Sequence, residues 1–199
     1  MDDDFFHPAQ REVQQMLATA DMATRIADTR LRRTIEGEDE ALVREARFFF
    51  LATRAPDGTL DASIKCGPVG FVTVDGPSRI VFPDYDGNGM FRSLGNIRAT
   101  ADVALLFVEL SGRKRKLRVQ GRGHVEVCAP AQHLPATAGD QARVCVTVTR
   151  VFPNCPRYLP SMEWAGDCDH VSALGREPLE PDWKRKPDLA PWVAPRRVY

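Results

Sequence analysis

The feature that most constrains the fold is a series of short apolar or alternating segments between residues 47 and 152, each ended by a turn signal. Glycine- and proline-containing turns, such as those at 56–58 and 75–78, separate the segments. Alternation with a period of two and apolar runs of this length predict strands at 47–53, 61–66, 71–74, 79–82, 102–109, 114–127 and 143–152. About seven strands joined mostly by short turns predict a mainly β protein, an antiparallel barrel that is closed or half-closed.

The segments outside this series have a different pattern. Apolar residues at three- and four-residue steps predict one helix over 8–34 and a short helix over 39–46, and a third short helix is expected over 90–99. The tail after Phe152 holds eight of the 15 prolines and all three tryptophans. We therefore expect an N-terminal helical extension (1–46), a barrel (47–160) and a C-terminal arm (161–199) that packs by its aromatic side chains.

Charge and cysteine content exclude several classes of function. The 27 basic and 27 acidic residues cancel, so no nucleic-acid partner is expected, and no apolar run approaches membrane-spanning length. The acidic residues after Met1 do not match a secretory signal, and five cysteines without a CxxC pair indicate a reducing compartment. We expect a cytoplasmic protein with no metal site, since Cys155, Cys168 and His170 lack an evident fourth ligand.

The candidate site lies within 61–122. Ser63 and Lys65 share one face of a strand, and a glycine-containing loop at 83–89 leads into a predicted helix. Backbone N–H groups at such a helix start, together with lysine and arginine side chains, are typical of a phosphate-binding pocket. The same residues also fit an ordinary hairpin, a capped helix and a charged strand face, so pattern alone leaves both interpretations open.

A family resemblance favours the pocket. The runs at 6–14, 67–71, 82–88, 93–97, 117–121 and 154–158 occur in the order and spacing of a known group of proteins. Over about residues 5–160 the chain resembles the pyridoxamine 5′-phosphate oxidase-like superfamily of FMN-binding split barrels, and more narrowly its flavin-nucleotide-binding subgroup. The resemblance implies an antiparallel split barrel that forms a homodimer, with FMN bound in each of two clefts at the subunit interface.

The resemblance also assigns site residues. It places Lys65, beside Ser63, at the FMN phosphate and Phe82 and Pro83 along the edge of the isoalloxazine ring. The loop and helix that grip the phosphate and ribityl chain contribute Asn88, Arg92, Ser93 and Asn96. Lys116 and Arg118 approach the ring from the partner strand. In place of the Arg-Lys pair of the pyridoxamine phosphate oxidases proper, this chain has Asn88-Gly89, so their substrate does not carry over.

These assignments predict an FMN-dependent oxidoreductase that acts on a small molecule. Arg157 and Tyr158 are the candidate catalytic residues, since arginine binds anionic substrates and tyrosine stacks or donates a proton. A structural turn at 156–158 is the alternative interpretation of these two residues. The alternative functions are a flavin-binding protein without catalysis, and the same barrel using F420 or haem.

Overall fold

The computed structural model describes residues 5–109, 112–127, 140–166, 169–170 and 179–193. Its helices are α1 (Pro8–Met16), α2 (Ala20–Arg30), α3 (Glu38–Glu45) and α4 (Arg92–Thr100), with two 3-10 turns, η1 (Asp182–Arg185) and η2 (Ala190–Trp192). Its strands are β1 (Phe48–Arg54), β2 (Leu60–Cys66), β3 (Thr73–Val74), β4 (Arg79–Tyr85), β5 (Asp102–Val108), β6 (Lys116–Val127) and β7 (Asp140–Asn154).

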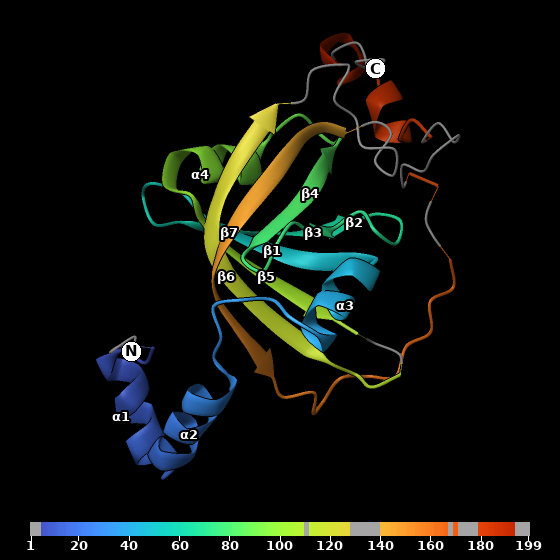
Figure 1. Ribbon diagram of the computed structural model, residues 1–199. Coiled ribbons are helices and arrows are strands. Elements are labelled where there is room, and N and C mark those ends of the chain that lie inside the picture. The colour runs from blue at the N-terminus through green and yellow to red at the C-terminus, as the bar shows by residue number, and fades with distance from the viewer. Residues whose placement is uncertain (1–4, 110–111, 128–139, 167–168, 171–178, 194–199) are drawn as a thin grey trace.

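The seven strands form one antiparallel sheet in the order β2-β1-β5-β6-β7-β4-β3. The sheet coils around its own inner face, and α4 covers one opening while α3 lies by the other side (Figure 1). Its end strands, β2 and β3, do not pair with each other. The predicted mainly β fold, an antiparallel split barrel, is therefore confirmed.

The core fills the inside of this coil. Phe49 of β1 lies at its centre, with ring centroids 4.9 Å from Phe82 and 5.1 Å from Phe107. Phe71 packs on the same ring at 6.0 Å, and Gly67 allows that approach, because a Cβ there would lie 2.4 Å from the Phe71 ring. Alternation along each strand therefore buries one face, as the sequence predicts.

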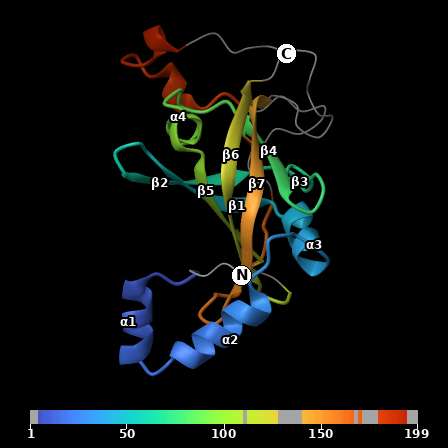
Figure 2. The ribbon, with the colours of Figure 1, turned by 60° about the vertical axis from the view of Figure 1, so that its left-hand side comes forward.

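The prediction of one helix over 8–34 is wrong. The chain turns at Ala18, which has a φ of 52°, and α1 and α2 fold back on each other away from the barrel (Figures 1 and 2). The Arg11 side chain donates to the Thr24 hydroxyl at 2.9 Å across this turn. Apolar periodicity continues through both helices and therefore does not indicate the break.

Several observed strand boundaries differ from the predicted ones by a few residues. Strand β7 is longer than predicted at both ends, β4 extends to Tyr85, and β3 is only two residues long. The segment between the predicted strands at 114–127 and 143–152 lies mostly outside the described residues, although Asp140 already belongs to β7. Among the described residues, no helix combines the length and apolar character needed to cross a lipid bilayer.

The described part of the C-terminal arm makes one clear aromatic contact with the barrel. Trp164 stacks on Phe48 of β1 with ring centroids 6.3 Å apart and planes 9° apart, and the Arg47 guanidinium lies 5.4 Å from the Trp164 ring. Trp192, in contrast, is 84% exposed. The aromatic side chains of the arm therefore do not all pack on their own barrel.

Candidate functional site

A pocket of about 270 Å³ opens between β2, the tip of β4 and the start of α4. The loop between β4 and α4 forms its rim, with Gly87, Asn88 and Gly89 in the lining. The elements meet here because α4 packs across β1, β2 and β6 and thereby brings its first turn to β2. Strands that are distant in the sequence thus supply the walls of one cavity.

Strand β2 presents three polar side chains to the pocket. Asp61, Ser63 and Lys65 alternate with exposed residues and therefore share one face. The Ser63 and Ser93 hydroxyl oxygens lie 3.3 Å apart. Asp61 accepts hydrogen bonds from the Ser93 hydroxyl at 3.2 Å and from Arg92 Nε at 3.3 Å, which fixes the first turn of α4 against β2.

The Lys65 ammonium is paired inside the pocket with a carboxylate. Lys65 Nζ donates to Asp84 Oδ1 at 2.9 Å, and the other Asp84 oxygen accepts from Gln141 Nε2 at 3.2 Å. Only 7% of Asp84 is exposed. Gln141 also donates to the Tyr85 carbonyl at 2.9 Å, so β7 holds the tip of β4 in place around this ion pair.

The start of α4 offers free backbone donors. Its N-cap residue, Phe91, has a left-handed conformation and makes no side-chain capping hydrogen bond, so the first N–H groups of the helix are left uncapped. Asn88 accepts from the Met90 N–H at 3.0 Å and shapes the turn that precedes it. Uncapped N–H groups and the positive end of a helix favour an anion such as a phosphate.

Five of the predicted cofactor residues meet at this pocket: Ser63, Lys65, Asn88, Arg92 and Ser93. Asn96 lies one turn further along α4 and donates to the Thr53 hydroxyl at 3.0 Å. Phe82 is fully buried in the core, and Pro83 is buried opposite Arg143 of β7. The structure therefore does not bring Asn96, Phe82 or Pro83 into the lining.

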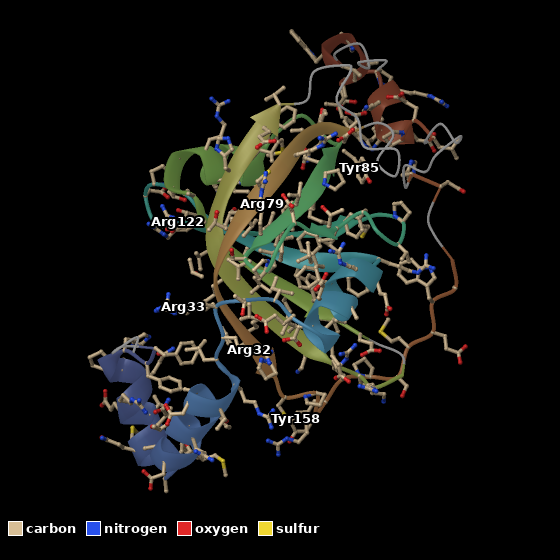
Figure 3. The ribbon with its side chains drawn as sticks, viewed as in Figure 1. Arg32, Arg33, Arg79, Tyr85, Arg122 and Tyr158 are labelled. Atoms are coloured by element: carbon tan, nitrogen blue, oxygen red, sulfur yellow. The ribbon has the colours of Figure 1, made fainter. Side chains whose placement is uncertain are left out.

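The remaining predicted residues lie elsewhere. Lys116 and Arg118 are on the outer face of β6, where the Arg118 guanidinium lies 5.9 Å from the Phe152 ring. Arg157 and Tyr158 follow β7 at the opposite end of the barrel from Tyr85 and the pocket (Figure 3). Arg157 donates to the Cys155 thiol at 3.1 Å, and Tyr158 is 97% exposed. The structure therefore does not bring these four residues to the pocket.

Sequence reasoning missed the acidic side of the site. Asp61 was visible in the alternation of β2, two residues before Ser63, but Asp84 and Gln141 join the site only through strand pairing. Tyr85 is another lining residue that was not predicted, and its buried hydroxyl has no hydrogen-bond partner among the described residues. Burial, and secondarily the charge of Asp140, raises the pKa of Tyr85 above its ordinary value.

The comparisons with known proteins agree with this architecture. Residues 35–152 match the family model described as pyridoxamine 5′-phosphate oxidase. No curated protein matches the chain. Cys168, one of the three residues considered for a metal site, lies outside the described residues.

Several solved structures are similar in shape at low identity. A Lactobacillus delbrueckii protein named as a candidate pyridoxamine 5′-phosphate oxidase is 22% identical, with a TM-score of 0.48 over 61% of this chain and 95% of that one. A HupZ variant from Group A Streptococcus is 14% identical, with a TM-score of 0.47 over 60% and 99% of the two chains. An FAD-binding protein from Mesorhizobium loti is 14% identical, with a TM-score of 0.40 over 63% and 99%.

Proposed function

The chain belongs to the pyridoxamine 5′-phosphate oxidase family, and from this premise we propose that it binds FMN and acts as a flavin-dependent oxidoreductase on a small molecule. In this proposal the pocket beside Lys65 and α4 holds the phosphate end of FMN. The flavin would supply the hydride chemistry, and the protein would supply binding, orientation and exclusion of water.

The donor set of the pocket is the observation that carries the proposal. It combines the Lys65 ammonium, the Arg92 guanidinium, the hydroxyls of Ser63 and Ser93 and the uncapped N–H groups of α4. This is the chemistry that a phosphate monoester requires, namely positive charge together with several hydrogen-bond donors. Asp61 and Asp84 partly neutralise the two cations in the ligand-free protein, so the pocket does not hold unpaired charges.

The outer face of the sheet supports a homodimer. A row of apolar side chains crosses it, because Phe50 is the strand neighbour of both Ile64 and Leu106. Phe50 and Ile64 are 45% and 55% exposed, so this row presents a contiguous apolar surface on the outer face of the sheet. Arg118 is next to Leu106 in the same row, so a second protomer docked there would cover it.

The size of the pocket also supports a shared site. At about 270 Å³ it is smaller than the roughly 300–1,000 Å³ of pockets that enclose a complete small-molecule ligand. A single protomer would therefore hold one end of the cofactor. We propose that Lys116 and Arg118 of the partner subunit complete the site around the ring, as the resemblance implies.

The position of the candidate catalytic residues favours a second function. Arg157 and Tyr158 are distant from the pocket of their own protomer, so neither residue reaches a substrate bound there. The second candidate is accordingly a flavin-binding protein without turnover. Haem receives no support, because none of the described residues lining the pocket is a histidine.

The first experiment is an absorbance spectrum of the purified protein, before and after incubation with FMN and gel filtration. We expect a flavin spectrum at about one FMN per chain. Lys65→Ala removes a charge-assisted hydrogen bond and should weaken FMN binding by roughly 10–100-fold. Lys186→Ala, at an exposed lysine, is the matched control.

Each result has a defined meaning. Full FMN retention by Lys65→Ala would remove Lys65 from the phosphate site. A wild-type protein that fails to retain FMN would refute the cofactor assignment. Turnover with nicotinamide donors, oxygen and candidate substrates would then separate an oxidoreductase from a flavin carrier.

A further inference from the structure

The C-terminal segment returns to the loop beside the pocket through one buried lysine. Lys184 of η1 has a side chain only 8% exposed, and its ammonium pairs with the carboxylates of Asp86 and Glu180. The Lys184–Glu180 distance is 3.0 Å. Figures 1 and 2 show η1, in red, at the same end of the barrel as the tip of β4. The contact between Lys184 and Asp86 joins positions 98 residues apart.

A buried lysine is rare and needs compensation. Lysine is almost never buried unless it is paired, because the ammonium loses its hydration. Burial by itself would lower the pKa of Lys184, but the hydrogen bonds to Asp86 and Glu180 outweigh it and raise the pKa above the usual value. Lys184 is therefore charged at neutral pH, and the stabilisation that its charge provides is lost as the pH rises through this raised pKa.

Asp86, the partner of Lys184, directly precedes the loop that lines the pocket. Asp86 is the residue immediately before Gly87, Asn88 and Gly89, which line the pocket. Residues 86–92 are exposed, and two of the first four are glycine, so the backbone has much conformational freedom to lose when a ligand binds. A charged contact that fixes Asp86 reduces that freedom before binding.

We propose that Lys184 is a positioning residue that holds the pocket loop at Asp86 and thereby sets the affinity for the phosphate-bearing ligand. Lys184 touches the loop and not the ligand, so its effect is exerted through Asp86. The part that concerns FMN rests on the proposed function. The site then depends on a segment that lies beyond residues 35–152, the range matched by the family model.

The test compares Lys184→Met with Arg185→Met. Arg185 is in the same 3-10 turn but is 72% exposed and lies 3.8 Å from the fully exposed Asp182, so it controls for the loss of a cation there. Hydrogen exchange of the ligand-free proteins measures the loop directly. We expect Lys184→Met to accelerate amide exchange at residues 87–91 several-fold and to leave exchange in strands β5 and β6 unchanged. Arg185→Met should leave exchange at residues 87–91 unchanged.

Binding gives a second, independent readout. Lys184→Met should raise the FMN dissociation constant about tenfold, and Lys184→Arg should recover most of the loss. Asp86→Asn should cause a similar loss, and the double variant should be no worse than either single one, because both changes remove the same contact.

The outcomes separate the two proposals. If the wild-type protein does not bind FMN, the proposed function fails, while exchange at residues 87–91 still tests Lys184. Unchanged loop exchange in Lys184→Met would overturn the assignment. So would equal acceleration in β5 and β6, which would indicate that Lys184 stabilises the whole fold. A tenfold loss of affinity in Arg185→Met would also overturn it, since charge alone would then explain the effect.

Discussion

Asp84 offers the most discriminating test of the pocket, because its removal should change stability and affinity in opposite directions. Asp84→Asn replaces a carboxylate with an amide of nearly the same shape. In the structure this carboxylate is the counter-ion of Lys65 and is also held by Gln141. Its side chain is 10% exposed and that of Lys65 is 20% exposed, so solvent screens their interaction only partly.

The loss of stability follows from this geometry. Removing one partner of a fully buried ion pair costs about 3–5 kcal/mol. Here the Lys65 ammonium can turn toward solvent, and the asparagine oxygen can still accept its hydrogen bond. We therefore expect the free energy of unfolding of the ligand-free protein to fall by about 1–3 kcal/mol.

The affinity for FMN should increase. A phosphate oxygen that accepts from the same ammonium would lie within about 6 Å of Asp84, where repulsion between unit charges is about 3 kcal/mol at an effective dielectric constant of about 20. The open mouth of the pocket reduces this value. We expect a dissociation constant about tenfold lower in Asp84→Asn, equivalent to about 1.4 kcal/mol.

Urea unfolding of the ligand-free protein and titration with FMN measure the two quantities separately. Asp182→Asn, at a fully exposed carboxylate, is the control for a change in net charge. Weaker FMN binding by Asp84→Asn, with unaltered stability, would refute the counter-ion role.

Three further predictions test other parts of the molecule. Gly121→Ala would place a Cβ 2.4 Å from the Thr147 carbonyl oxygen. We therefore expect the free energy of unfolding, measured in urea, to fall by about 2–4 kcal/mol. A fall below about 0.5 kcal/mol would contradict the close packing of β6 on β7. A hydrogen bond from Arg157 lowers the pKa of the Cys155 thiol, so iodoacetamide should modify Cys155 at lower pH than an ordinary thiol. Arg157→Ala should shift the pH midpoint of this modification upward, as measured by peptide mass spectrometry. Phe50→Glu should yield monomers in light scattering, and an unchanged dimer would exclude the outer face as the interface.

The sequence predicted the barrel well because its signal is local. Alternation along each strand reports which side chains are buried, and turn residues report where strands end, so seven strands could be placed within a few residues. The same alternation put Ser63 and Lys65 on one face and would have added Asp61. Helix periodicity failed at Ala18, because alanine is a good helix former and a single left-handed residue leaves no pattern.

The site was predicted only in part. Asn88, Arg92 and Ser93 lie on one continuous loop and helix start, so their proximity to one another is a property of the local sequence. Phe82, in contrast, is only two residues from Asp84, yet its ring belongs to the core while Asp84 lines the pocket. Sequence proximity to the pocket could not distinguish these two neighbours, because the lining depends on the elements packed around each one.

The sequence by itself thus determined which residues face inward along each strand, because side-chain direction follows from backbone geometry within a few residues. Only the tertiary structure decided which charges meet. Lys65 pairs with Asp84 because two strands separated in the sequence end at one pocket, and Lys184 reaches Asp86 across 98 positions. The first pair is fixed by the curling of the sheet, which brings β2 close to β4, and the second by the return of the C-terminal segment. Neither is encoded in a local pattern.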